Sequence, residues 1–223
     1  RPAMTGVYIN LTDSSTTFVA TDSHRLIRYR RVDVASDNGN AIIIPRKALN
    51  LLRSTLPSEN INVSVEFNVS NAFFKFGNIR MICRLIDERF PDYENVIPTD
   101  NQNTMSINRM EFLGSLRRIA IYANKTTHQV RLKITGSELQ ISAEDLDFAN
   151  EANERLSCDH NGEDIEIGFN AKFLVEMLGN IDSKEIELRL SAPNKAGLII
   201  PKDTDDNEDI LMLVMPVMLN NYV

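Results

Sequence analysis

Short runs of alternating apolar and polar residues fill the first part of the chain. Runs at residues 7–9, 17–20 and 26–29 are separated by polar clusters at 10–15 and 22–23. Such alternation between turn-forming residues is typical of antiparallel strands. It predicts a meander, followed after a polar loop by a buried strand at residues 41–44.

In three segments the apolar residues recur at the spacing of a helix. Apolar residues predict helices at residues 47–56 and 108–123 and a third helix through Phe173 and Leu178, with Pro45 at the first position of the first helix and Asn108 as an N-cap. Further strands are predicted at residues 61–67, 72–76, 79–85, 105–107, 130–134, 139–143, 149–158, 164–170, 185–190 and 197–200.

The order of elements repeats along the chain. A strand, a corner residue, a helix and further strands follow one another around Pro45 and again around Asn170, which are 170 − 45 = 125 residues apart. A repeat of this kind predicts two copies of a β-rich unit with helices on one face. We expect an α+β fold with domains at residues 1–98 and 99–223, divided where composition shifts at 99–103. The helix at 108–123 has no counterpart before Arg1, so the first copy is expected to be truncated.

Residues 211–219 form an apolar run near the end of the chain. Its first half fits a buried strand, and Pro216 removes a backbone donor and ends central pairing. Beyond Pro216 two interpretations stay open. The segment is either the frayed end of a core strand, or Met215, Val217 and Met218 line a groove, since flexible thioethers suit surfaces that accept several partners.

Composition excludes several classes. The 223 residues are 43% hydrophobic and 25% charged, as in a globular chain, and no apolar run reaches the roughly 20 residues that span a bilayer. Two isolated cysteines and three scattered histidines predict neither a disulfide framework nor a metal site and favour a reduced, cytoplasmic setting.

Positive charge is concentrated on two predicted helices, although the net charge is −7. The first helix carries Arg46, Lys47 and Arg53, and the second carries Arg109, Arg117 and Arg118. One such helix is usually a solvated face. Two on a repeated scaffold favour a surface that meets phosphates without reading sequence.

Candidate chemistry is sparse. Asp22, Ser23 and His24 are adjacent, and a hydrolase using His24 with Asp22 or Ser23 is the alternative function, although triad members normally come from separate segments. Glu144, Asp145 and Asp147 fit a turn with solvated carboxylates better than a metal site. No glycine-rich phosphate loop occurs.

Several motifs, taken in order, resemble the bacterial sliding clamp family, the beta subunit of DNA polymerase III. They are Ala-Thr-Asp-Ser-His-Arg-Leu at 20–26, Ile-Ile-Pro-Arg-Lys at 43–47, Phe-Pro-Asp-Tyr at 90–93, Ile-Glu-Ile-Gly-Phe-Asn at 165–170 and Val-Met-Pro at 214–216. The resemblance covers nearly the whole chain and implies most of a middle clamp domain followed by a complete C-terminal one.

The resemblance implies a non-catalytic processivity factor for DNA replication. Clamp subunits close as a homodimeric ring around double-stranded DNA, with antiparallel sheets outside and helices lining the channel. They tether the replicative polymerase, the clamp loader and repair proteins through peptides that enter a groove. Neither a cofactor, a metal nor a membrane is implied.

Matching positions give the expected site residues. The groove would use Met4, Thr21, Ser23, His24, Arg25, Leu26, Pro91, Asn95, Val96, Thr127, Asn170, Phe173, Leu213, Val214, Met215, Pro216, Val217, Met218 and Leu219. Asn194 and Ala196 match less closely. The basic residues of the two helices would face DNA, and Ile121 and Tyr122 match the subunit joint.

The chain departs from the family pattern at three places. Many relatives have glycine where Ser23 stands and a larger aromatic where Thr127 stands. Many end in Met-Pro-Met-Arg-Leu, whereas this chain has Val217, Met218 and Leu219 after Pro216. The missing arginine puts a salt bridge to an acidic peptide in doubt.

Overall fold

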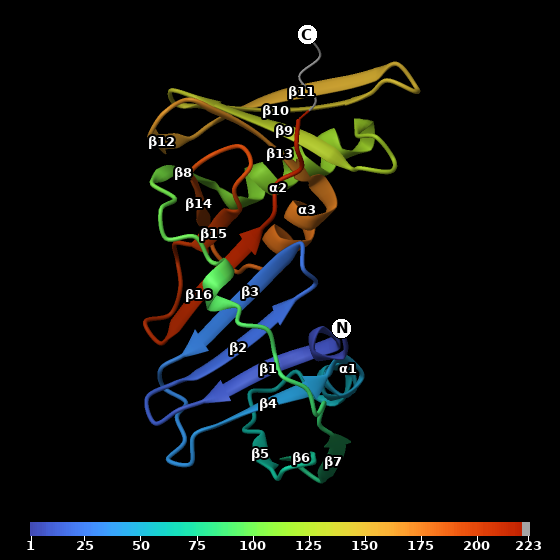
Figure 1. Cartoon of the computed structure of the whole chain (residues 1–223), viewed down its shortest axis with the longest axis vertical. Helices are drawn as coiled ribbons and strands as arrows, with labels where there is room; N and C mark the ends of the chain where they lie inside the picture. Colours follow the sequence, from blue (N-terminus) through green and yellow to red (C-terminus); the bar gives the residue numbers. More distant parts are fainter. Residues whose placement is uncertain (220–223) are drawn as a thin grey trace. The chain divides into compact units, whose positions relative to one another are not determined.

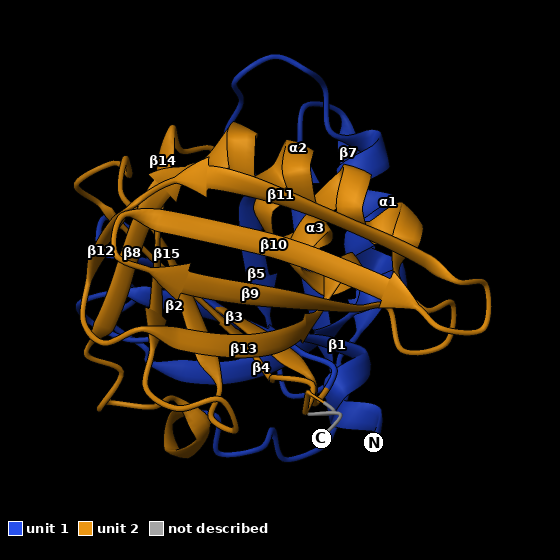
Figure 2. Ribbon diagram, turned by 90° about the horizontal axis from the view of Figure 1, so that it is seen from above, with its two compact units in different colours: residues 1–22, 28–93 blue, residues 23–27, 94–223 orange. Residues whose placement is uncertain are grey.

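A computed structural model describes residues 1–219 and divides the chain into two compact units. Unit 1 comprises Arg1–Asp22 and Arg28–Tyr93, and unit 2 comprises Ser23–Ile27 and Glu94–Val223 (Figure 2). The boundary predicted after residue 98 lies in the irregular segment that follows η2 (Glu94–Val96).

Unit 1 begins with a short 3-10 helix and the predicted meander. Its first elements are η1 (Pro2–Thr5), β1 (Gly6–Leu11), β2 (Thr16–Thr21), β3 (Arg25–Arg31) and β4 (Asn40–Pro45). The strands lie in the order β3-β2-β1-β4, and β1 pairs antiparallel with both β2 and β4 (Figure 1).

The rest of unit 1 is a helix and a three-stranded antiparallel sheet. These elements are α1 (Arg46–Thr55), β5 (Ser64–Phe67), β6 (Asn71–Phe76) and β7 (Ile79–Arg84). The core joins Ile42 and Ile44 of β4 to Ala72 and Phe74 of β6, with apolar residues of α1 packed against them. The strand predicted from residue 61 begins only at Ser64.

Unit 2 contains the α-helices α2 and α3 and two antiparallel sheets. After η2 come β8 (Asn103–Asn108), α2 (Arg109–Ile119), η3 (Ala120–Tyr122), β9 (Gln129–Thr135), β10 (Glu138–Asp145), β11 (Asn150–Ser157), β12 (Asp159–Asn161), β13 (Ile165–Asn170), α3 (Ala171–Gly179), β14 (Glu185–Leu190), β15 (Gly197–Pro201) and β16 (Glu208–Val214). The short strand β12 was not predicted.

The helices of unit 2 pack between its two sheets. One sheet has the order β11-β10-β9-β13, and the other contains β12-β8-β14-β15-β16. A single core includes Phe112 and Leu116 of α2, Leu174 of α3, Phe169 of β13 and Val214 of β16, each fully buried. Figure 2 shows the four-stranded sheet lying across α2 and α3.

The predicted repeat is confirmed. The order β3-β2-β1-β4 of unit 1 corresponds to β11-β10-β9-β13 of unit 2, and both β4 and β13 lead into a helix. Pro45 and Asn170 are the N-caps of those helices. Pro45 is therefore one position earlier than expected, because its ψ of 142° keeps it in the extended strand. Asn108 caps α2 as predicted, since its side chain accepts the Glu111 amide.

Among the described residues, no helix has both the length and the apolar character needed to cross a bilayer. Both cysteines, Cys83 and Cys158, are free.

Candidate functional site

The final segment of the described chain divides at Val214. Leu213 and Val214 are at most 3% exposed, so the first half of the apolar run is a buried strand, as predicted. Met215 and Met218 are 43% and 64% exposed. The residues after β16 therefore present an apolar surface, instead of extending the core of the same sheet.

Val217 attaches this segment to the other sheet of unit 2. Its amide donates to the carbonyl oxygen of Gly168 in β13 at 2.8 Å, as an isolated antiparallel bridge. A Cβ at Gly168 would lie 2.4 Å from the Val217 oxygen and 2.8 Å from Cδ2 of Leu219. Only glycine allows this approach, and a glycine inside a predicted strand was the one sequence signal for it.

Ser23–Ile27 belongs to unit 2 and packs beside the residues after β16, 215–219, which we call the tail. The Met215 amide donates to the carbonyl oxygen of His24 at 2.8 Å. The His24 ring stacks on Phe173 of α3 with centroids 6.0 Å apart, and the Arg25 guanidinium lies 4.6 Å from the same ring. These contacts join the segment to the tail and to α3.

Arg25 also forms an ion pair that sequence reasoning missed. Its guanidinium lies 2.9 Å from a carboxylate oxygen of Glu176, one turn beyond Phe173 on α3. No motif marks Glu176, because the pair depends on two segments meeting in space. Arg25 is thus neutralised by Glu176 and stacked on Phe173.

The chain enters this site through a constrained residue. Ser23 has a φ of 77°, in the left-handed region that favours glycine. Leu26, two residues beyond His24, is 5% exposed and supports the site from the core.

Asn170 begins α3 and so determines where Phe173 lies. Its side-chain oxygen accepts the amides of Lys172 at 3.0 Å and Phe173 at 3.4 Å. Two helix donors that would otherwise lack partners are satisfied, as in a standard N-cap. The structure therefore gives this predicted binding residue a positioning role.

The other predicted groove residues are distributed over both units. In unit 2, Val96 in η2 is 57% exposed, Asn95 precedes it, and Thr127 is exposed in the loop before β9. In unit 1, Met4 lies in η1, Thr21 ends β2, and Pro91 is exposed. Within that unit, Pro91 follows Phe90, whose ring stacks on Tyr8 with centroids 4.8 Å apart.

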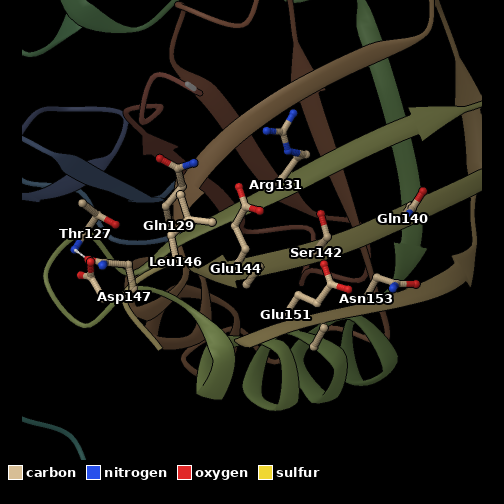
Figure 3. A pocket seen from close by; sticks show the side chains of 13 residues that line it. Thr127, Gln129, Arg131, Gln140, Ser142, Glu144, Leu146, Asp147, Glu151 and Asn153 are labelled. Carbon is tan, nitrogen blue, oxygen red and sulfur yellow. Dashed lines mark hydrogen bonds between the residues drawn. The ribbon is translucent and has the colours of Figure 1, made fainter. Parts of the chain in front are cut away.

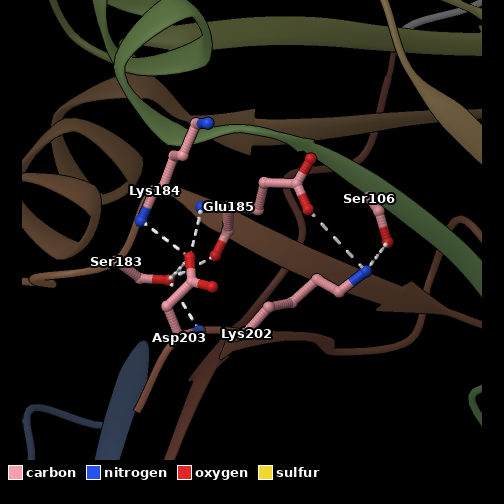
Figure 4. A network of polar contacts seen from close by, with 6 residues as sticks. All are labelled: Ser106, Ser183, Lys184, Glu185, Lys202 and Asp203. Atoms are coloured by element: carbon pink, nitrogen blue, oxygen red, sulfur yellow. Dashed lines mark hydrogen bonds and ion pairs between the residues drawn. The ribbon is translucent and has the colours of Figure 1, made fainter.

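A polar network fixes the loop that leads into β16. A carboxylate oxygen of Asp203 accepts the amides of Lys184 at 3.0 Å and Glu185 at 3.1 Å and lies 3.2 Å from the Ser183 hydroxyl (Figure 4). These hydrogen bonds, led by that from Glu185, hold the pKa of Asp203 below its usual range. Lys202 adds a contact to Ser106 at 3.2 Å.

A hollow of unit 2 lies elsewhere, on the outward face of the four-stranded sheet. It encloses about 590 Å³, and its lining is polar, with Thr127 and Asp147 toward one end, Gln140 and Asn153 toward the other, and Glu144 and Arg131 between them (Figure 3). Glu144 and Glu151 are direct cross-strand neighbours. Thr127 is the one predicted groove residue on its wall.

The basic residues predicted to face DNA fall into two groups. Arg46, Lys47, Arg53 and Arg117 are exposed on α1 and α2. The guanidinium of Arg109 forms hydrogen bonds within unit 2, because it donates to the carbonyl oxygens of Ser183 at 2.6 Å and Leu178 at 3.0 Å.

Arg118 is exposed but already paired. It binds Glu154 through two hydrogen bonds of 2.7 Å, which raise the pKa of Arg118 and lower that of Glu154. Ile121 and Tyr122, the residues predicted at a subunit joint, follow in η3 and are 65% and 41% exposed.

The structure supports neither the hydrolase using His24 nor a metal site at Glu144, Asp145 and Asp147. His24 is engaged with Phe173 and the tail, and Ser23 is constrained by its backbone. Asp145 is only 4% exposed and accepts the Asp147 amide at 3.1 Å, so the expectation of solvated carboxylates in this turn is wrong for Asp145. Residues 1–219 contain no group of three or more His, Cys, Asp or Glu placed to hold a metal ion. Burial raises the pKa of both thiols, which disfavours thiolates.

Comparison with known proteins finds two matching domain families in order. Residues 1–92 match the central domain of the DNA polymerase III beta subunit, and residues 94–218 match its C-terminal domain. The beta sliding clamp of Staphylococcus epidermidis is 30% identical over 219 residues, covering 97% of this chain and 57% of that protein. That of Pseudomonas aeruginosa is 28% identical over 95% of this chain and 58% of the relative.

Solved structures agree. The sliding clamp of Pseudomonas aeruginosa bound to griselimycin superposes with a TM-score of 0.91 at 28% identity, covering 97% of this chain and 58% of that one. The clamp of Bacillus subtilis gives a TM-score of 0.91 at 27% identity, covering 99% and 58%. The chain thus spans somewhat more than half the length of these relatives, and none of them is described as a hydrolase. With two domain families matched in order over nearly its whole length, this chain belongs to the DNA polymerase III beta subunit family.

Proposed function

We propose that the protein containing this chain is a sliding clamp and processivity factor. It encircles duplex DNA as a homodimeric ring in the cytoplasm and tethers polymerases, clamp loader and repair proteins. The observation that carries this proposal is the ordered match of the central and C-terminal clamp domains along residues 1–92 and 94–218. The function requires no catalytic group, and the engaged state of His24 is consistent with that.

The DNA-facing role rests on the exposed cations of the helices. Arg46, Lys47 and Arg53 on α1 and Arg117 on α2 carry the proposal, because their side chains are exposed. Arg118 contributes less, since Glu154 already binds its guanidinium. Arg109 supports α3 instead. Contacts of this kind attract phosphates without reading sequence.

The partner-binding role rests on the surface around Met215 and Met218. We assign linear peptides to it because Met215, whose amide binds His24, and Met218 are both exposed, and methionine adapts to varied apolar side chains. The remaining residues predicted for the groove belong to the same proposal. Ile121 and Tyr122 are proposed as the subunit joint, because exposed apolar residues are typical of interfaces.

The test is calorimetric titration of the chain with a short clamp-binding peptide of the Gln-Leu type, with a scrambled peptide as the control. Micromolar binding, about 8 kcal/mol, is expected for the first peptide alone. Equal binding of both peptides, or binding of neither at about 1 mM, would refute the partner site.

A further inference from the structure

The three-stranded sheet of unit 1 has an outward face that the proposed function does not use. In β6, Ala72, Phe74 and Phe76 are at most 4% exposed and face the core. Successive side chains on a strand point to opposite faces, so Phe73 and Lys75 lie on the outward face. Their direct partners in β7 are Ile82 and Arg80, and Asn71 is opposite Arg84.

This face has a central row with two apolar residues and one acidic residue, and it has cations in the rows on both sides. Ile82 is 65% exposed and Phe73 is half-buried, and Glu66 of β5 completes their row. Lys75 and Arg80 form the row on one side, and Arg84 lies on the other. Adjacent rows are about 7 Å apart, because they are separated by two residues along a strand.

In the part of the chain that the structure describes, the cations of this face have no acidic partners. Among residues 1–219, no carboxylate lies within ion-pairing distance of Lys75, Arg80 or Arg84. With Glu66 as the one acidic residue of these rows, the face has a net charge of 3 − 1 = +2 in a chain of net charge −7.

In unit 2 the strands β14, β15 and β16 follow α3 as β5, β6 and β7 follow α1, and they differ in this respect. The cations there are paired, with Arg189 lying 2.5 Å from Glu187 and Lys202 lying 3.9 Å from Glu185. The unpaired cations of unit 1 are therefore not a general property of the repeated sheet.

We propose that the outward face of β5–β6–β7 binds single-stranded DNA. The Phe73 ring would stack on a base, while Lys75, Arg80 and Arg84 contact the phosphates on either side. A π-face flanked by cations is the usual arrangement for single strands, because every base can stack and every nucleotide carries a phosphate. This inference does not depend on the peptide site or on the ring.

An acidic peptide would also meet the cations, but the aromatic residue favours nucleic acid. The ring lies in the row between the two basic rows, where a base would lie between two phosphates. An acidic strand would need only the charges, so its binding would be insensitive to loss of the ring.

The test is fluorescence anisotropy with a labelled oligothymidylate of about 16 nucleotides. The chain should bind with Kd below about 100 μM, and log K should fall with log salt at a slope near −2, since three cations meet a single strand. The triple variant Lys75→Gln, Arg80→Gln, Arg84→Gln should abolish binding, and Phe73→Ala should weaken it at least about fivefold. The matched control Arg189→Gln with Lys202→Gln, which removes two paired cations of unit 2, should leave it unchanged.

Two further measurements make the result decisive. Thermal melting must show that the triple variant and Phe73→Ala remain folded; if either does not, Ile82→Asn and the single Arg84→Gln variant replace them. An abasic oligonucleotide should bind at least about fivefold more weakly than the oligothymidylate. Three outcomes would overturn the proposal. The unaltered chain could show no detectable binding, or it could bind the abasic strand with equal affinity. It could also bind labelled polyglutamate with equal affinity, with that binding unaffected by Phe73→Ala.

Discussion

Gly168 of β13 and Val217 of the segment after β16 are joined by a 2.8 Å hydrogen bond, and the backbone of Val217 occupies the space that a side chain at position 168 would need. We expect Gly168→Ala to displace the tail from β13, because its Cβ would lie 2.4 Å from the Val217 oxygen. Peptide affinity should fall at least tenfold, and thermal melting should show lower stability.

Gly114→Ala in α2 provides the matched control. The added Cβ would meet only the flexible end of Arg118 at 3.3 Å, and alanine favours helix by about 1 kcal/mol over glycine. Stability should therefore stay equal or rise. If Gly168→Ala behaves like Gly114→Ala, the bridge does not hold the tail.

Met218→Ala, and to a lesser degree Met215→Ala, should weaken peptide binding while the fold is retained. Peptide anchors are worth about 2 kcal/mol or more when truncated, which is more than tenfold in Kd. Exposed residues contribute within about 0.5 kcal/mol to stability. Calorimetry and melting of the same variants separate the effects, with Met212→Ala as the buried control expected to lose about 2–5 kcal/mol of stability. A Met218 variant that melts early and binds normally would show that the tail is only core.

Ala149→Gly should raise the free energy of unfolding by up to about 1 kcal/mol, because Ala149 has a φ of 52° in the turn between β10 and β11 and left-handed backbone is costly for residues with a Cβ. Ser23→Gly relieves the same kind of strain at a φ of 77° and should shift the melting temperature in the same direction. Chemical denaturation measures both. A destabilised Ala149→Gly protein would mean that the strain is absent in solution.

Asp203→Asn should lower stability at neutral pH and flatten its dependence on acid. The pKa of Asp203 is lowered in the folded state, mainly by the Glu185 amide, so its contribution is fully present above the unfolded pKa, near 3.9. That contribution is lost as pH falls through the lower folded value. Denaturation between pH 2 and 7 should show a shallower loss for the variant than for the parent. Parallel curves would contradict this role.

Charge reversal of Arg46, Lys47, Arg117 and Arg118 should abolish weak, sequence-independent binding of duplex DNA. For roughly three or four neutralised phosphates, the parent should show log K falling with log salt at a slope near −3. Reversal of Lys195, which is exposed in the loop between β14 and β15, is the control and should change little. Tight binding that survives the four changes, or a clear base preference, would refute the DNA-facing assignment.

Local patterns predicted much of this fold. Apolar spacing located the helices and all strands except β12, and the matching corners at Pro45 and Asn170 predicted the repeat correctly. Pro216 correctly indicated that the segment beyond it would leave the sheet of β16, because proline cannot donate to a ladder.

Contacts between distant segments were not predictable from those patterns. Arg25 pairs with Glu176, which is 151 positions away. Arg109 donates to Ser183, 74 positions away, and Val217 donates to Gly168, 49 positions away. Periodicity carries no information over such separations. Burial of Asp145 was missed for a related reason, since acidic side chains in turns are usually hydrated.

The ion pair between Arg25 and Glu176 leaves the proposed peptide surface with little net charge. With Met218 and Leu219 in the tail and Arg25 already neutralised on Phe173, capture of a peptide there depends on apolar contact, which dissolved ions screen little. The phosphate contacts proposed for the exposed helix cations would weaken steeply as ionic strength rises. Under the proposed function, a rise in ionic strength would therefore weaken DNA binding and leave peptide binding largely unchanged.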